Sequence, residues 1–218
     1  MDNDIMTAVN FLFRWMHVLF GITWIGILYY FNFVQTEYFK EAESGALADC
    51  KAKLAPRALW WFRWGAMFTF LTGLVLLGGL HQGVILVNDY IVVGAVMAVL
   101  MFLNVWLIIW PKQRIVLGLA EGDVAAAAPR ASLASRTNTL FSAPMVFCML
   151  ASPHMGYQAD HLLTAEGGGL GMWLALALVL LLEVNILVGK PGPLASVRGV
   201  IHMSLALTAA VVCLLIYL

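Results

Sequence analysis

The chain contains few charged residues. Asp, Glu, Lys and Arg make up 11% of its 218 residues, whereas 62% are hydrophobic. A typical soluble domain is about 25% charged, so the composition excludes an ordinary soluble globular protein. The 12 basic residues balance the 12 acidic residues, and no basic block is present that could neutralise nucleic-acid phosphates. The sequence therefore predicts a protein of the lipid bilayer that has no nucleic-acid partner.

Cysteines and processing signals are also scarce. The 3 cysteines lie far apart, and no Cys-x-x-Cys-His motif is present that would attach haem covalently. The first four residues contain neither the basic region nor the cleavage site of a signal peptide. We therefore expect the first apolar segment to be retained and any haem to be held by coordination alone.

Apolar segments of about 20 residues, the length that crosses a bilayer as a helix, recur along the chain. The fourth is the least apolar, because it includes the polar residues 135–139 and a proline. The sequence predicts an all-α, polytopic membrane protein that forms a single domain over residues 1–218. Its predicted transmembrane helices, about six, lie near residues 15–34, 64–80, 91–110, 134–152, 170–189 and 199–218.

Basic residues are distributed unevenly about these spans. Of the 12 Lys and Arg residues, only Arg14 lies on the side of the membrane that holds both termini. Because basic loops stay in the cytoplasm, we expect external termini and a multi-pass protein of the bacterial inner (cytoplasmic) membrane. The residues on the predicted cytoplasmic side are Lys40, Lys51, Lys53, Arg57, Arg63, Lys112, Arg114, Arg130, Arg136, Lys190 and Arg198.

Histidines gather toward the predicted external side. His17 lies inside the first span, about one helical turn past Arg14, while His81 ends the second span and His154 ends the fourth. An ionisable residue inside a membrane span is costly and usually functional. Imidazoles are common axial ligands of haem iron, so we predict a b-type haem held by His17 and by either His81 or His154. For the two residues at helix ends, hydrogen bonding to water or headgroups explains the position equally well.

A second polar layer is predicted near the cytoplasmic side. Glu183 precedes the end of the fifth span, and His202 lies a few residues into the sixth. A charged residue near the middle of a membrane costs about 2.5–3.5 kcal/mol on insertion scales, so Glu183 needs a partner. We predict a Glu183–His202 pair, with Asn104, Arg136, Asn138 and Asn185 at comparable depth. The cluster indicates either a proton relay or a site for a small polar anion, or else a polar contact that only fixes helix packing.

Two stretches of the sequence resemble a known family. Residues 14–26, which contain His17 and Trp24, resemble the first helix of the membrane domain of bacterial membrane-bound urate oxidases, the urate hydroxylases that carry a C-terminal cytochrome c. Residues 135–140, followed by 144–147, resemble a second and more discriminating signature of the same family. Two features depart from that pattern. No cytochrome c domain is visible, which indicates a short form, and Thr137 stands where the family is expected to have a histidine.

The resemblance implies oxidation of urate to 5-hydroxyisourate, with electrons passing to a cytochrome c. In that interpretation Arg136 and Asn138 orient the anion, and Glu183 and His202 handle protons. We therefore expect a redox-active membrane protein that binds haem b and passes electrons to an external cytochrome c. It could also oxidise urate or a similar small heterocycle. The alternative is a non-catalytic accessory subunit packed against a larger respiratory or photosynthetic complex. A proton-coupled transporter is less favoured, because no inverted repeat or pair of broken helices is visible.

Overall fold

A computed structural model describes residues 3–80, 87–155 and 168–218. These residues are almost entirely helical, and no strand is found among them, which confirms the all-α prediction. Each predicted span coincides with a helix. The six long helices are α1 (Asn3–Tyr29), α4 (Ala55–Leu80), α5 (Asp89–Leu103), α7 (Val124–Met155), α8 (Leu170–Val188) and α9 (Val197–Tyr217).

Within the described part of the chain, four continuous helices are long and apolar enough to cross a membrane. They cover Asp4–Glu41, Ser44–Gly79, Asp89–Val116 and Val197–Tyr217, and Leu170–Ile186 forms a shorter apolar helix. In the third, α5 continues through the π-helix η3 (Asn104–Ile109) into α6 (Trp110–Val116). The helix α7, with 32 residues, is longer than two of these four, but it carries many polar side chains. These lengths and compositions are compatible with a membrane protein.

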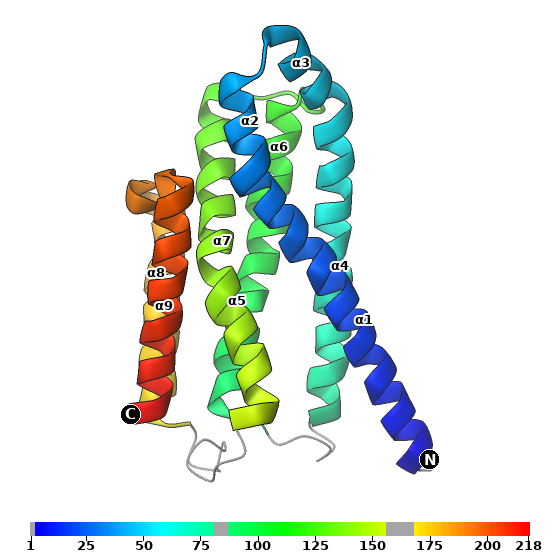
Figure 1. Ribbon diagram of the computed structural model, residues 1–218, viewed down its shortest axis with the longest axis vertical. Coiled ribbons are helices and arrows are strands. Elements are labelled where there is room, and N and C mark those ends of the chain that lie inside the picture. The colour runs from blue at the N-terminus through cyan, green and yellow to red at the C-terminus, as the bar shows by residue number, and fades with distance from the viewer. Residues whose placement is uncertain (1–2, 81–86, 156–167) are drawn as a thin grey trace. The chain divides into compact units, whose positions relative to one another are not determined.

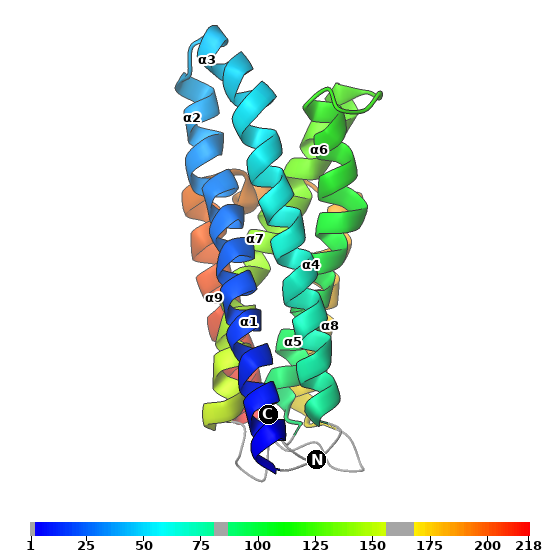
Figure 2. The ribbon, with the colours of Figure 1, turned by 90° about the vertical axis from the view of Figure 1, so that its right-hand side faces the viewer.

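The chain divides into two compact units, residues 1–85 with 114–121, and residues 86–113 with 122–218. In the first unit α1 packs along α4, as Figure 2 shows. Trp24 and Leu28 of α1 and Phe62 of α4 are fully buried. Gly65 allows this close approach, because a Cβ at that position would lie 3.2 Å from the Trp24 backbone nitrogen.

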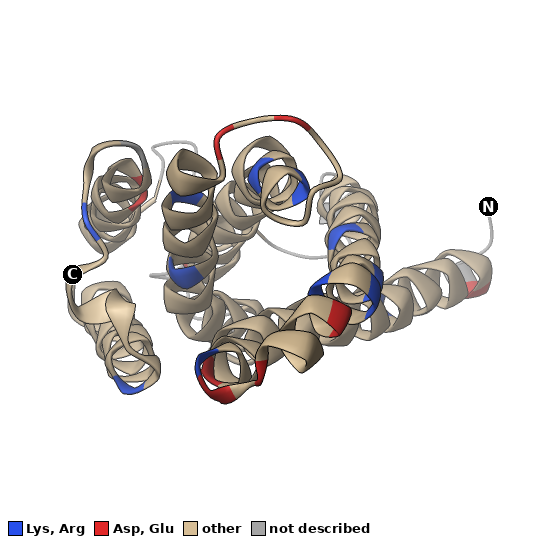
Figure 3. Cartoon of the chain, turned by 90° about the horizontal axis from the view of Figure 1, so that it is seen from above, with Lys and Arg blue, Asp and Glu red and all other residues tan. Residues whose placement is uncertain are grey.

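The connection between α1 and α4 is helical and charged. It consists of η1 (Tyr30–Gln35), α2 (Thr36–Glu41), α3 (Ser44–Asp49) and η2 (Cys50–Leu54), of which η1 and η2 are π-helices. Lys40 pairs with Glu37 at 2.7 Å, and Lys53 pairs with Asp49. Figure 3 shows the blue and red residues of this unit gathered mainly on this connection, while most of the α1 and α4 surface is uncharged. This is the distribution expected when the long helices lie in lipid and their connection lies in water.

In the second unit α7 is the central helix. It packs against α5, η3, α8 and α9, and α8 also packs against α9 (Figure 1). The short helix η5 (Gly192–Ala195) connects α8 to α9, and Gly192 has a φ of +47°, a left-handed conformation that glycine adopts without strain. The Ser196 hydroxyl then accepts a hydrogen bond from the Gly199 N–H at 3.0 Å and caps α9.

A proline inside α7 explains one of the contacts between α7 and α9. Pro144 has no N–H, so the Leu140 carbonyl, one turn earlier, cannot receive its usual helical hydrogen bond. The Ser204 hydroxyl of α9 donates to that carbonyl at 2.8 Å. Lipid offers no water to satisfy a free carbonyl, so the serine supplies the bond that the proline removes.

Candidate functional site

The second unit contains a buried network of polar side chains from three elements. The Asn104 amide, at the first residue of η3, donates to Asn138 Oδ1 of α7 at 2.9 Å and to Glu183 Oε2 of α8 at 3.3 Å. The Asn138 amide donates in turn to the Met101 carbonyl at 2.9 Å. Asn104 and Asn138 are 2% and 0% exposed, respectively. The result is a continuous path of hydrogen bonds from a carboxylate into the centre of the unit.

One stretch of α7 brings an unusual number of polar groups into the interior. All of its residues from Arg136 to Ser142 are buried, and Arg136 is only 4% exposed. The smaller side chains bond to their own helix, since Thr137 donates to the Leu133 carbonyl at 3.1 Å and Ser142 to the Thr139 carbonyl at 2.7 Å. Asn138 instead bonds across helices. The segment predicted from sequence as part of a site is therefore buried in the protein rather than exposed to lipid.

The predicted Glu183–His202 pair is wrong. Glu183 accepts its hydrogen bond from Asn104, while His202 is exposed on α9, and no hydrogen bond or ion pair joins the two side chains among the described residues. The spacing of Glu183 and His202 from the turn between their helices gave similar depths. It did not give the rotation of each helix about its axis, which turns His202 outward.

Asn104 is the residue whose importance the sequence interpretation missed. Sequence position places Asn104 only as a polar residue at similar depth, yet in the structure it joins Glu183 to Asn138. Its position at the start of a π-helical segment is significant, because short π-helical insertions are rare and frequent at functional sites. A lone asparagine in the apolar stretch 91–110 was the available signal.

In the first unit, His17 lies half-buried against α4. Its Nδ1 lies 3.1 Å from Thr72 Oγ1. A Cβ on Gly73 would lie 3.2 Å from His17 Cε1, so the absence of a side chain at Gly73 lets the ring approach α4. The histidine is thus held by a specific polar contact and does not project freely from the helix.

The structure says less about the other two predicted haem ligands, His81 and His154. His81 lies outside the described residues. His154 is exposed, in the last turn of α7, in the second unit. Within the described part of the chain, no group of three or more His, Cys, Asp or Glu side chains could hold a metal ion. A haem needs only two axial ligands, so the predicted haem site stays a prediction.

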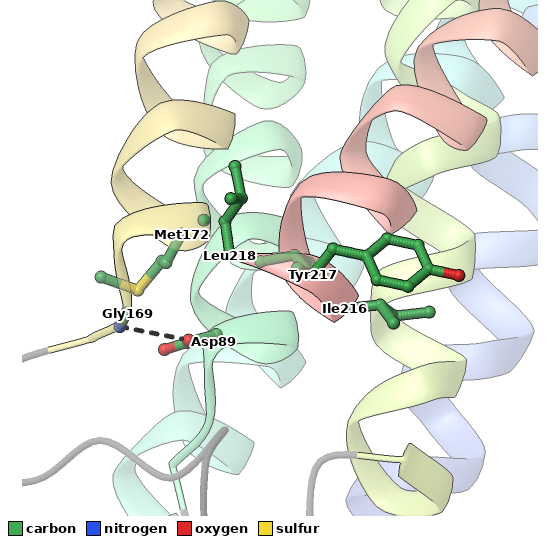
Figure 4. A pocket seen from close by; sticks show the side chains of 8 residues that line it. Asp89, Gly169, Met172, Ile216, Tyr217 and Leu218 are labelled. Carbon is green, nitrogen blue, oxygen red and sulfur yellow. Dashed lines mark hydrogen bonds between the residues drawn. The ribbon is translucent and has the colours of Figure 1, made fainter.

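A small pocket of about 200 Å³ lies at the N-terminal ends of α5 and α8 and the end of α9. Figure 4 shows Asp89 beside Gly169, whose N–H donates to Asp89 Oδ2 at 3.3 Å, with Met172 next to Gly169. Among the described residues, none of those predicted as site residues lines this pocket. It offers one buried carboxylate among apolar groups, and it does not adjoin the Asn104 network.

Comparison with known proteins relates the second unit to a family. Residues 86–188 match a family model described as urate oxidase N-terminal. These residues, slightly under half of the chain, are similar to the N-terminal part of urate oxidases as that model describes it. The match includes the second resembling stretch of the sequence and all of Asn104, Arg136, Asn138 and Glu183, whereas His17 precedes it and His202 follows it. No curated protein and no solved structure matches this chain.

Proposed function

We propose that this chain is a multi-pass oxidoreductase of the bacterial inner membrane that oxidises urate or a similar small heterocycle and passes the electrons to an external cytochrome c. It would cross the membrane about six times with both termini external. The observation that carries the proposal is the network that joins half-buried Glu183 to the buried Asn104 and Asn138, which lies entirely within the segment that matches the urate oxidase family model.

The chemical groups of the network suit a planar anion with several N–H and C=O groups. Arg136, two residues before Asn138 on α7, supplies a buried positive charge near the network in sequence, and guanidinium groups bind anions through several donors in a fixed plane. Asn138 is held by two hydrogen bonds, one at its amide nitrogen and one at its oxygen. The Asn104 amide donates its hydrogens to Asn138 and Glu183, and the second of these bonds fixes the Glu183 carboxylate in one orientation. A held carboxylate is a competent proton acceptor.

The proposed reaction balances without molecular oxygen. Water adds to C5 of urate, two electrons leave the heterocycle and two protons are released, which gives 5-hydroxyisourate. Two molecules of ferricytochrome c accept one electron each and become ferrous. Glu183 accepts a proton as the water adds, and Arg136 and Asn138 orient the substrate anion.

A b-type haem fits this proposal at His17. Its ring is held at Nδ1, which is the arrangement common to histidines that bind a metal through the other nitrogen. His17 would supply one axial ligand, and His81 or His154 the second. When bound, the haem would relay single electrons toward the cytochrome c.

The experiment compares the purified wild-type protein with Glu183→Gln in detergent micelles. Urate and a ferricytochrome c are added, and the reduced cytochrome and 5-hydroxyisourate are followed by absorbance. Glutamine can still accept the Asn104 hydrogen bond but takes up no proton, so we expect turnover to fall by about 10²–10⁴-fold, the usual contribution of a general base.

The matched control is Glu121→Gln, the same change at an exposed glutamate outside the network, which should leave turnover within about twofold of wild type. Unchanged thermal unfolding of Glu183→Gln separates loss of chemistry from loss of folding. Failure of the wild-type protein to reduce cytochrome c with urate or with related heterocycles would refute the proposed function. Full activity in Glu183→Gln would remove Glu183 from the mechanism.

A further inference from the structure

The Thr72 hydroxyl donates its only hydrogen to the backbone of its own helix, α4. Its Oγ1 lies 2.7 Å from the Phe68 carbonyl and 3.0 Å from the Thr69 carbonyl. A carbonyl oxygen can only accept, so the single hydroxyl proton points toward the backbone of α4. The oxygen then has only lone pairs to offer to His17 Nδ1, at 3.1 Å. The histidine must donate in this contact, and Nδ1 must carry the proton.

We infer that Thr72 is a positioning residue that holds His17 in its Nδ1-protonated tautomer, so that Nε2 presents its lone pair to a metal such as haem iron. This inference rests on the proposed function for its purpose, but the tautomer itself is a property of the first unit alone. Gly73 contributes by letting the ring lie close to α4. Neutral imidazole with a fixed tautomer is the form that binds iron, and the partner of the second nitrogen sets which tautomer is present.

The chain offers a closely matched control at Thr69. Thr69 and Thr72 are on the same helix and are 7% and 6% exposed, and each hydroxyl donates to the backbone of the preceding turn. The Thr69 hydroxyl bonds to the Gly65 carbonyl at 2.7 Å and makes no hydrogen bond to His17. Thr69→Val and Thr72→Val thus each remove one buried hydroxyl of the same kind. Only the Thr72 hydroxyl faces the imidazole.

The test measures ¹⁵N chemical shifts of histidine-labelled full-length protein in detergent before any haem is added, at about pH 8.5, where an ordinary histidine with a pKa of about 6.5 is neutral. His17→Ala identifies the His17 signals. We expect the wild type and Thr72→Ser to show Nε2 in its unprotonated form, Thr72→Val to show mixed tautomers, and Thr69→Val to resemble the wild type. A protonated Nε2 in the wild type, or no change in Thr72→Val, would overturn the inference.

Haem titration then separates this inference from the proposed function. Loss of a partner that orients a metal ligand typically weakens metal binding by about 10–100-fold, so Thr72→Val should raise the haem Kd by that factor, and Thr72→Ser should restore it. Equal weakening in Thr69→Val would overturn the assignment to Thr72. If the wild type binds no haem but Thr72 still sets the tautomer, the positioning role stands and the haem proposal fails.

Discussion

Removal of the Ser204 hydroxyl tests whether that side chain replaces the hydrogen bond that Pro144 takes from α7. Ser204 is 5% exposed, and its hydroxyl lies 2.8 Å from the Leu140 carbonyl and 3.3 Å from the Thr139 carbonyl. One proton cannot serve both oxygens fully, and the shorter contact is to the carbonyl that has lost its helical partner. Ser204→Ala therefore leaves one buried carbonyl without a donor.

The magnitude follows from measured hydrogen bonds between membrane helices. These contribute about 0.6 kcal/mol on average and at most about 1.7 kcal/mol, and a buried group left unsatisfied costs about 1–3 kcal/mol. We expect Ser204→Ala to lower the free energy of unfolding by about 1 kcal/mol, roughly a fivefold change in the folding equilibrium. In a Pro144→Ala background, residue 144 has an N–H that can reach the Leu140 carbonyl. The same serine substitution should then cost about half as much or less.

The assay is reversible unfolding in mixed micelles, followed by tryptophan fluorescence, for the wild type, both single variants and the double variant. Thr208→Ala is the control, because Thr208 donates to the Ser204 carbonyl within α9 at 2.8 Å and makes no hydrogen bond to another helix in the described ranges. Its cost should be the same with and without Pro144. An equal cost of Ser204→Ala in both backgrounds would refute the compensation between serine and proline.

Two further predictions concern His17 and the junction of α5 with α7. His17→Ala should abolish or shift the α-band of a b-type haem in the dithionite-reduced optical spectrum, while Glu183→Gln leaves that band intact; an unchanged spectrum in His17→Ala would assign the ligand elsewhere. Asn88 caps α5 by accepting from the Ile91 N–H at 3.0 Å and also donates to the Ser152 carbonyl and hydroxyl of α7, both at 3.2 Å. Asn88→Ala should therefore lower the free energy of unfolding, measured by denaturant titration, by about 1–2 kcal/mol. Asn88→Asp keeps the cap and should lower it less. Equal losses in the two variants would exclude a contribution from the cap.

The positions of the helices were predictable because they depend on local properties of the sequence. A helix satisfies its own backbone hydrogen bonds, so an apolar stretch of about 20 residues is helical in lipid whatever its neighbours are. The polar residues 135–139 were visible as an exception, and α7 buries them. The relation to urate oxidases was also visible from residues 135–147, which lie within the matched segment.

The contacts between helices were not predictable, because they depend on how each helix is rotated about its axis. Sequence placed Glu183 and His202 at similar depth, but tertiary packing turns His202 outward. Glu183 instead accepts a hydrogen bond from Asn104, the first residue of a π-helical segment that no periodicity indicated. In the same way, the sequence singled out His17, but only the packing of α1 on α4 supplied Thr72 as the partner of its Nδ1. Depth in the membrane follows from sequence position, whereas the partner of a buried polar group follows from which faces of two helices meet.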